Sequence, residues 1–234
     1  MLRRPVLNCI NCQSLALSVF CTLRSDELLD LNKEKVSYTY KKGQVIFSES
    51  NRPSGIFCVH SGKVKIYKIN SEGKEQIVRL AKDGDLIGYR SFLANEEYHA
   101  FAETLEESVI CTIPGTTVLQ LLSQNINLSL KMMEHMAKDI MAADQKSVDL
   151  LAKTARERLC EALVILYKSF GVDEDGFIDI RLTRENIGNL TGMAIETVVR
   201  TLKEISDEGL IVRDKKRLLI PDIAKLMDEA RMVD

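Results

Sequence analysis

The sequence predicts an α+β protein with a β-rich N-terminal half, a long central helix and a small helical C-terminal domain that includes a β-hairpin. Three stretches carry this prediction: strand-like runs separated by glycine turns over 36–118, apolar residues at helical spacing over 116–152, and two helices joined by a tight turn over 181–217. Short strands with regular turn signals are typical of a β-sandwich or barrel.

We expect four parts along the chain. They are a cysteine-containing segment at 1–22, a β-roll at 23–118, a helix at 119–152 and the C-terminal domain at 153–234. The β-roll is predicted from the runs VSYTY, QVIFSES, GIFCVHSG, KVKIYKI, QIVRLAKDGDLIG and SVICTIPG.

The overall composition excludes several classes of protein. The chain has 234 residues and a formal net charge of −2, which is enough length for two domains with separate cores. No apolar run approaches the roughly 20 residues of a membrane span, and polar residues and cysteines interrupt the N-terminus too often for a signal peptide. We therefore expect a cytoplasmic protein without a membrane partner. Any contact with nucleic acid must come from a local basic face, because the net charge is close to neutral.

The C-terminal domain is predicted to begin with a helix pair. A short helix is expected at 184–190, a turn at Thr191–Gly192 and a longer helix at about 195–207. The Thr183 hydroxyl can cap the first helix by accepting from a free backbone N–H. Gly192 supplies the backbone freedom that a sharp turn between helices requires.

The longer helix and the segment after it complete a winged helix-turn-helix pattern. Val198, Leu202 and Ile205 recur at helical spacing and should face the core. The segment LIVRDKKRLLI then places two apolar runs around a basic turn, which is typical of a β-hairpin wing. In such domains the second helix enters the DNA major groove by its N-terminus. The sequence therefore predicts double-stranded DNA as a partner.

Two exposed residues of the longer helix are suited to reading bases. Glu196 and Arg200 lie four apart, so they share one face of the helix. Glu can accept from cytosine N4, and Arg can donate two hydrogen bonds to guanine O6 and N7. Further side chains can hold phosphates, which fixes register without reading sequence. These phosphate candidates are Arg184, Thr197, Lys203, Lys215, Lys216 and Arg217.

The run from Glu196 to Arg200, with its E-x-x-x-R core, resembles the recognition helix of the Crp/Fnr family of bacterial transcription regulators. The phrases KKGQVIFSES, SGKVKIY and GDLIG resemble that family's effector domain, a cyclic-nucleotide-binding-type β-roll. The resemblance implies that Glu196 and Arg200 read the G·C pairs of a TGA-type half-site. Val199 suits contact with a thymine methyl group. RNA polymerase is a further expected partner if the protein activates transcription. Ala194 stands where the family often has a Ser or Thr helix cap.

The central helix is expected to form a homodimer. A heptad-like stripe steps along it by three and four, which suits a two-stranded coiled coil between subunits. The stripe consists of Met133, Met136, Ile140, Ala143, Ser147 and Leu150. The alternative is a helix packed only on its own β-roll. A dimer is favoured because one helix-turn-helix reads half a site, and dimers read two half-sites about one DNA turn apart.

The resemblance also bears on what the β-roll senses. Family members that bind cyclic AMP place a Glu after the glycine of a FIGE-like phrase and an Arg-Ser pair further on. Here Tyr89 stands at the Glu position, and Tyr98 and His99 stand near the Arg-Ser positions. A cyclic phosphate requires a positive or N–H-rich partner, and Glu96 and Glu97 would repel it. We therefore expect that the chain does not bind cyclic AMP in the usual way.

The cysteines indicate a different signal. Clustered cysteines in a cytoplasmic protein favour metal or redox chemistry over a disulfide framework. The Fnr branch holds a four-iron, four-sulfide (4Fe-4S) cluster with three N-terminal cysteines and a fourth in the β-roll. The resemblance therefore implies Cys9, Cys12, Cys21 and Cys111 as cluster ligands. The eight residues between Cys12 and Cys21 exceed the branch's usual spacing.

Other interpretations of the sensor stay open. Zinc is one, although four-cysteine zinc sites usually come as two close pairs. Haem is another, with His60, His99 and His135 as candidate ligands. A small organic ligand in the β-roll is a third. Cys58 and Cys160 stand in apolar contexts and are expected to be core residues.

The chain is not expected to be an enzyme. It contains no P-loop, no G-x-S-x-G elbow and no His-Glu-x-x-His motif. The competing function is a cyclic-nucleotide-binding-type ligand-binding or structural module that does not read DNA. Arg200 and the basic wing are both present, which favours the DNA-binding interpretation.

Overall fold

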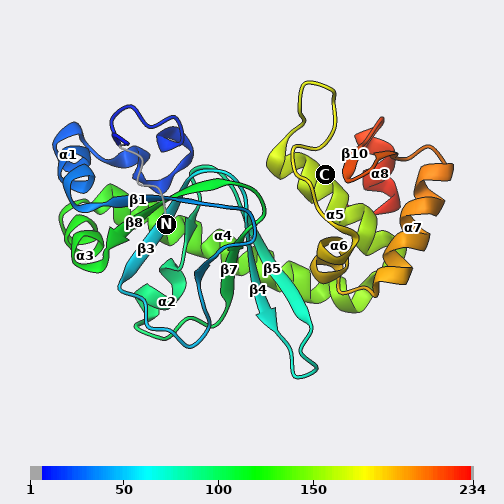
Figure 1. Ribbon diagram of the computed structural model, residues 1–234, viewed down its shortest axis with the longest axis horizontal. Coiled ribbons are helices and arrows are strands. Elements are labelled where there is room, and N and C mark those ends of the chain that lie inside the picture. The colour runs from blue at the N-terminus through cyan, green and yellow to red at the C-terminus, as the bar shows by residue number, and fades with distance from the viewer. Residues whose placement is uncertain (1–6, 233–234) are drawn as a thin grey trace. The chain divides into compact units, whose positions relative to one another are not determined.

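The structure is a computed structural model that describes residues 7–232 (Figure 1). It divides into two compact units. The N-terminal unit extends to Ile69 and resumes over Val78–Met141, and the C-terminal unit comprises Asn70–Ile77 and the described chain from Ala142 onward. The α+β class is confirmed, with a β-roll followed by long helices and a winged helix-turn-helix. No helix of the described chain is long and apolar enough to cross a membrane.

Two four-stranded sheets form the β-roll, in the orders β1-β8-β3-β6 and β2-β7-β4-β5 (Figure 1). The strands are β1 (Val36–Tyr40), β2 (Val45–Phe47), β3 (Gly55–Ser61), β4 (Val64–Ile69), β5 (Glu75–Ala81), β6 (Leu86–Ile87), β7 (Phe101–Thr104) and β8 (Ser108–Pro114). The six predicted runs cover all of these except β7, and β5 begins one residue before its run, at Glu75. Side chains such as Val59, Val64 and Ile110 fill the space within the roll and are fully buried.

A second apolar cluster lies where helices cover the sheet that contains β3 and β8. Its helices are the 3₁₀ turns η1 (Leu15–Leu17) and η2 (Val19–Thr22) together with α1 (Ser25–Glu34), α2 (Tyr89–Ala94), α3 (Gly115–Gln124) and the start of α4 (Ile126–Ala152). Phe20 and Leu31 are among its buried members. The cluster fixes the N-terminal segment, which carries Cys9 and Cys12, against the β-roll.

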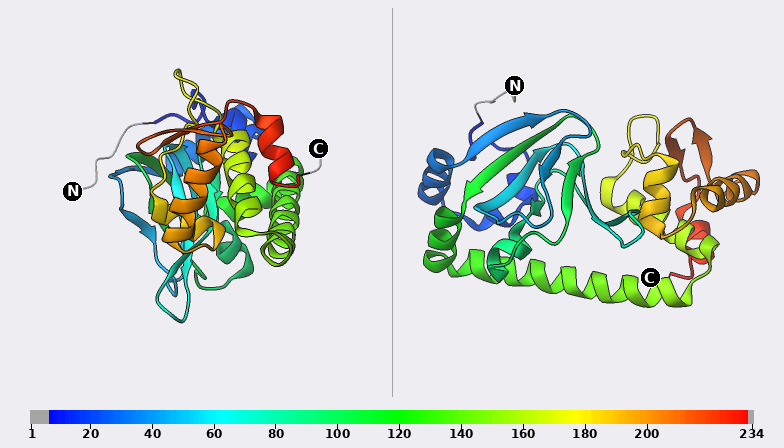
Figure 2. Two further views of the ribbon diagram at one scale, coloured as in Figure 1. Left: turned by 90° about the vertical axis from the view of Figure 1, so that its right-hand side faces the viewer. Right: turned by 60° about the horizontal axis from the view of Figure 1, so that its bottom comes forward.

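The predicted single helix over 119–152 is wrong in one respect, because the structure breaks it at Asn125. The Asn125 side chain accepts from Leu128 N at 3.0 Å and so caps a new helix, α4. Its amide also donates to Glu27 Oε2 at 2.8 Å, a carboxylate from α1. From Ile126 onward the helix continues for 27 residues (Figure 2).

The C-terminal unit is built on α5 (Ala155–Phe170), against which α6 (Arg184–Thr191), α7 (Ile195–Asp207) and α8 (Ile223–Glu229) pack. Thr154 and Glu157 form a capping box at the start of α5. Leu159 and Leu163 of α5 are fully buried, so the apolar face of this helix lies in the core of the unit. The wing is the antiparallel pair β9 (Val212–Asp214) and β10 (Arg217–Leu219).

Candidate functional site

The turn between α6 and α7 is fixed by local contacts. Gly192 has φ +68° and ends α6, and Met193 N donates to Gly188 O at 3.0 Å. A Cβ on Gly188 would lie 2.8 Å from Met193 O, closer than side-chain carbons approach. Thr183 caps α6 by accepting from Asn186 N at 3.0 Å, as the sequence predicts. These contacts hold the two helices in a defined relation.

The α7 helix has one buried face and one exposed face. Val198, Leu202 and Ile205 are fully buried, which confirms the predicted core face. Glu196 and Arg200 are exposed on the other side, one turn apart. The Arg200 side chain is 71% exposed, and within residues 7–232 its one ion pair joins Nε to Glu204 Oε1 at 3.8 Å. This loose pair leaves the guanidinium available to a partner.

The N-terminal end of α7 is also open. Ala194 is the N-cap and provides no side-chain hydrogen bond, as its residue type predicts. Ile195 and Val199 are 45% and 47% exposed. Backbone N–H groups without intrahelical partners and exposed apolar side chains therefore meet at the end that enters the groove in this class of domain.

The wing tip is basic and is linked to α6. Lys215 and Lys216 are exposed, and Lys215 adopts φ +52° in the tight turn. Arg184 Nη2 donates to Lys215 O at 3.2 Å, which ties the start of α6 to the wing. Among the described residues, Arg184 Nη1 is buried and has no hydrogen-bond partner. An acceptor from outside the chain would satisfy it.

Arg217 has two close carboxylate partners, although its Nε is buried without a hydrogen-bond partner in residues 7–232. Its Nη2 lies 2.6 Å from Asp175 Oδ2 and 3.1 Å from Asp173 Oδ2. Its guanidinium also stacks over the Phe177 ring at 4.0 Å. Asp175 and Asp173 raise the pKa of Arg217, and all three contacts hold the 173–177 loop. We therefore leave Arg217 out of the phosphate set that the sequence indicated.

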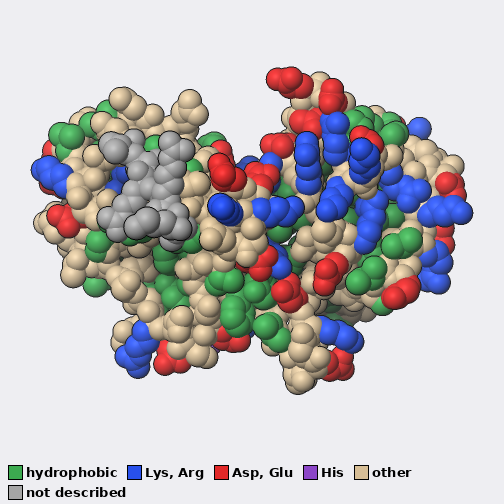
Figure 3. Space-filling view, in the orientation of Figure 1, with side chains coloured by type: hydrophobic (Ala, Val, Ile, Leu, Met, Phe, Trp, Pro, Cys, Tyr) green, Lys and Arg blue, Asp and Glu red, His purple; other side chains and the backbone are tan. Residues whose placement is uncertain are grey.

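Arg213 is a basic residue that the sequence interpretation missed. It is exposed on β9. Burial lowers the pKa of the half-buried Arg184, and the charge of Arg213 lowers it further. The pattern LIVRDKKRLLI contained a signal for it, because Arg213 belongs to the same basic run as Lys215 and Lys216. Figure 3 shows Lys and Arg side chains gathered on the face of the C-terminal unit that carries the wing and α7.

The α4 helix exposes an apolar stripe along its length. Most members are separated by three, four or seven residues, and Ile140 and Met141 are adjacent. The exposed members are Ile126, Leu130, Met133, Ile140, Met141, Val148 and Leu151. Of the residues expected at a dimer seam, Ala143, Ser147 and Leu150 are also exposed. Met136 differs, because it is half-buried and packs against the cluster that contains Leu128 and Met132.

Comparison with known proteins finds a family match in each of the two units. The family model of the cyclic nucleotide-binding domain matches residues 38–125, and that of the Crp-like helix-turn-helix domain matches residues 157–229. A fumarate nitrate reduction regulatory protein from Klebsiella oxytoca is 32% identical, over 96% of this chain and 93% of that protein. The chain belongs to the Crp/Fnr family of transcription regulators. Its C-terminal unit is therefore a DNA-binding domain.

Other members of the Crp/Fnr family show the same relationship. An anaerobic regulatory protein from Pasteurella multocida is 30% identical, over 94% of this chain and 82% of that protein. FixK2 from Bradyrhizobium japonicum superposes with a TM-score of 0.77 at 20% identity, over 86% of this chain and 99% of that chain. The c-di-GMP responsive regulator CLP from Xanthomonas campestris gives a TM-score of 0.73 at 17% identity, over 84% and 99%. These two structures share the fold.

A closed polar network surrounds Tyr89, the residue that the sequence resemblance sets at the glutamate position of cyclic-AMP-binding family members. Tyr89 is 1% exposed, and its hydroxyl donates to Asp139 of α4. Arg90 Nη2 lies 2.8 Å from Asp139 Oδ2, and Arg79 Nη1 lies 3.6 Å from it. Burial raises the pKa of Asp139, and the Arg79 charge opposes that shift. The network joins α2 and β5 to α4.

The aromatic residues near this position pack against other rings or face solvent. Tyr98 is buried, and its ring stacks on Phe47 with centroids 4.1 Å apart. His99 is exposed, and the His135 ring packs against Tyr89 with centroids 5.3 Å apart. Burial lowers the pKa of His135, so its imidazole is neutral near pH 7.

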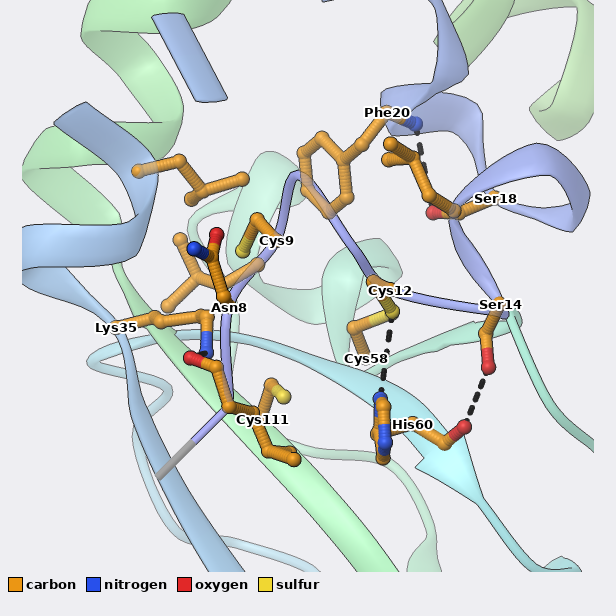
Figure 4. A pocket seen from close by; sticks show the side chains of 14 residues that line it. Asn8, Cys9, Cys12, Ser14, Ser18, Phe20, Lys35, Cys58, His60 and Cys111 are labelled. Carbon is orange, nitrogen blue, oxygen red and sulfur yellow. Dashed lines mark hydrogen bonds between the residues drawn. The ribbon is translucent and has the colours of Figure 1, made fainter. Parts of the chain in front are cut away.

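Four thiols surround a cavity of about 40 Å³ between the N-terminal segment and the sheet (Figure 4). Cys9 and Cys12 come from the N-terminal segment, Cys58 from β3 and Cys111 from β8. Of the four cysteines that the sequence indicated as ligands, Cys21 is absent from this lining, and it is exposed. Cys58, expected only to be a core residue, is present in it. Cys160 is buried in the C-terminal unit, as expected.

The surroundings of the thiols are partly apolar and carry positive charge. Burial raises the pKa of Cys9 to about 11, and it also raises the pKa of Cys58 and Cys111. Lys35 opposes this shift for Cys9 and Cys111. Its ammonium donates to Leu7 O at 3.0 Å, which holds it at the edge of the cavity.

The donor chemistry of this cavity fits an iron–sulfur cluster. Thiolates are the usual ligands of such clusters, and hydrogen bonds to sulfur tune them. Cys12 Sγ lies 3.3 Å from His60 Nδ1, and Cys111 Sγ lies 3.3 Å from Ser37 Oγ. Within residues 7–232, no three Cys, His, Asp or Glu side chains converge on a point for a single metal ion. The four thiols instead line the cavity.

Proposed function

We propose that this chain acts as a homodimer that reads a two-fold DNA site through Glu196, Arg200 and Val199. The observation that carries the proposal is the division of α7 into two faces. One face is fully buried, and on the exposed face Glu196 and Arg200 stand one turn apart. Arg200 donates to guanine O6 and N7, and Glu196 accepts from cytosine N4. Val199 contacts a thymine methyl group.

Phosphate contacts then fix the domain on the duplex. Lys215 and Lys216 hold one strand from the wing tip, where both are exposed. Arg184 Nη1 donates to a phosphate oxygen, which supplies the acceptor that this buried group lacks within the described chain. Thr197 and Lys203 extend the contact from α7, and we add Arg213 from β9. These contacts give affinity but no sequence information.

The dimer forms along α4. Apolar side chains of a soluble protein that recur along one helix face are normally covered, and the α4 stripe has the spacing of a coiled-coil seam. A second copy of the chain covers it and brings two recognition helices to one DNA site. The protein works in the cytoplasm by binding rather than catalysis, and contacts RNA polymerase when it activates transcription.

The signal is sensed in the N-terminal unit and is not cyclic AMP. Tyr89 and Asp139 satisfy each other where the nucleotide's polar groups would otherwise be held. The thiol cavity would hold an iron–sulfur cluster, with Cys9, Cys12 and Cys111 among its ligands. Such a cluster supplies redox-active iron whose potential depends on hydrogen bonds and solvent exposure. Lys35 balances the negative charge of the ligands. His60 Nδ1 and Ser37 Oγ each lie 3.3 Å from a ligand sulfur, where they would donate to a thiolate.

Control of DNA binding follows from a population shift. The N-terminal segment packs with α1, α3 and the start of α4 in one apolar cluster. A change in the segment therefore alters the packing of α4, and with it the balance between dimers that bind DNA and dimers that do not.

The test is a selection of binding sites from random duplexes with the anaerobically purified full-length protein. We expect a two-fold symmetric site with TGA-type half-sites about one helical turn apart. Cyclic AMP should change neither the affinity nor the selected site. Selection of a single asymmetric site, or no enrichment over random sequence, contradicts the proposal.

A further inference from the structure

The antiparallel pairing of β3 with β8 determines which cysteines meet. In the observed register Cys58 lies directly opposite Cys111. Residues directly opposite in an antiparallel pair point to the same face, with Cβ atoms roughly 4.5–5.5 Å apart. Both side chains line the thiol cavity, so the sheet itself presents two sulfurs on one side. The loop that carries Cys9 and Cys12 brings the other two.

Cys21 is held away from this cavity by its neighbours in sequence. It lies in η2, whose residues Val19 and Phe20 are 7% and 4% exposed and belong to the apolar cluster. Phe20 lines the thiol cavity, whereas Cys21 is exposed. Successive residues of a 3₁₀ turn point in different directions. Turning the Cys21 sulfur inward would therefore turn Phe20 out into water.

The positions of Cys9 and Cys12 are also fixed independently of any metal. Cys9 N donates to Asn32 Oδ1 of α1 at 3.0 Å, and Cys12 N donates to Cys9 O at 3.2 Å. The Ser14 hydroxyl donates to His60 O of β3. The segment is thus attached to α1 on one side and to β3 on the other, and the attachment to β3 is two residues from Cys58.

We propose that Cys58, and not Cys21, completes a four-thiolate ligand set with Cys9, Cys12 and Cys111 for an iron–sulfur cluster. The inference rests on the sensing part of the proposed function and identifies the fourth ligand of that site. The ligand set then consists of two sulfurs from one short loop and two from neighbouring strands (Figure 4). Lys35 is the nearby cation that offsets its negative charge.

The decisive experiment compares Cys58→Ser with Cys21→Ser in the full-length protein, purified without oxygen. Iron, acid-labile sulfide and zinc are measured per chain, together with the absorption spectrum. We expect Cys21→Ser to retain the iron and sulfide content of the unaltered protein, and Cys58→Ser to lose most of both. Loss in Cys21→Ser with retention in Cys58→Ser overturns the assignment. Zinc without iron in the unaltered protein overturns the choice of an iron–sulfur cluster.

A measurement on the unaltered protein guards against a Cys58 variant that misfolds. The iron-loaded protein is treated with an alkylating reagent, and the modified cysteines are located by mass spectrometry. We expect Cys21 to be alkylated while iron and sulfide stay bound. Protection of Cys21 until the iron leaves contradicts the inference. Neither assay uses DNA, so their failure leaves the base-reading proposal standing, and failure of the site selection leaves the ligand assignment standing.

Discussion

Replacing Arg200 with Ala tests the base-reading role most directly. The Arg200 side chain is 71% exposed, and its pair with Glu204 at 3.8 Å is a surface i,i+4 pair worth about 0.3–0.5 kcal/mol. Folding should therefore be almost unaffected. A bidentate contact to guanine is worth about 1–3 kcal/mol. Because a dimer makes the contact twice, we expect a loss of about 2–6 kcal/mol, or roughly 30- to 20,000-fold in affinity for the specific site.

The assay is competition fluorescence anisotropy with the selected duplex and a random duplex of equal length. Glu204→Ala is the matched control, since it breaks the same surface pair without removing a base contact. We expect it to change affinity for the selected duplex by less than about threefold, the equivalent of a surface pair. An equal loss for Arg200→Ala on both duplexes would mean that Arg200 holds phosphate and does not read a base.

A base substitution makes the Arg200 test specific to one atom. Replacing each guanine of the half-site in turn with 7-deazaguanine removes the N7 acceptor and keeps the base pair. At the guanine that Arg200 contacts, the protein and DNA changes should not be additive, with a coupling energy of about 1 kcal/mol or more. Additive losses at every guanine would refute the reasoning.

Three further changes test other parts of the proposal. Lys216→Ala should weaken binding to selected and random duplexes alike, and make the slope of log K against log salt less steep by about 0.9 per half-site. An unchanged slope would exclude a phosphate contact. Ala194→Ser should supply an acceptor for Thr197 N at the open start of α7 and stabilise the C-terminal unit by about 1 kcal/mol in urea unfolding; no gain would show that the cap does not form. Ile140→Asp places a charge in the apolar stripe, where the Ile140 side chain is 61% exposed, and should convert dimers to monomers in sedimentation equilibrium. The control Lys138→Ala, on another face of α4, should leave the dimer intact. A dimeric Ile140→Asp protein would place the seam elsewhere.

The helix-turn-helix could be predicted closely because its signals are local. The helices predicted at 184–190 and 195–207 are observed at Arg184–Thr191 and Ile195–Asp207. A capping Thr and a turn Gly act within a few residues, and the apolar period fixes the buried face. The sequence contains all of that information within one stretch.

The break at Asn125 depends on a partner far along the chain and could not be predicted in the same way. An Asn does not by itself end a helix, and the apolar pattern of the sequence continues on both sides of Asn125. Asn125 is distinguished by the Glu27 carboxylate, 98 residues away in the sequence, which accepts a hydrogen bond from the Asn125 side-chain N–H. The Asn125 side-chain oxygen meanwhile caps α4. Tertiary contacts of this kind override local propensity.

The cysteines show the same limit more sharply. Spacing along the chain groups Cys21 with Cys9 and Cys12, but spacing does not determine which way a side chain points. Strand register does: it sets Cys58 opposite Cys111 across 53 residues of sequence. One signal was available in GIFCVHSG, because period-two alternation places Cys58 and His60 on the same face of β3. Both line the thiol cavity.

The arginines of the C-terminal unit show why a count of basic residues does not define a DNA surface. Arg200 projects into solvent with one weak pair and is suited to a base edge. Arg184 is half-buried with one Nη donor unsatisfied within the described chain, so a fixed acceptor such as a phosphate oxygen suits it. Arg217 has two carboxylates and an aromatic ring as partners, and releasing it would leave Asp173 and Asp175 without their cation. The residue type is the same in all three cases, and it is the carboxylate partners that each guanidinium already has within the described chain that separate Arg217 from Arg184 and Arg200.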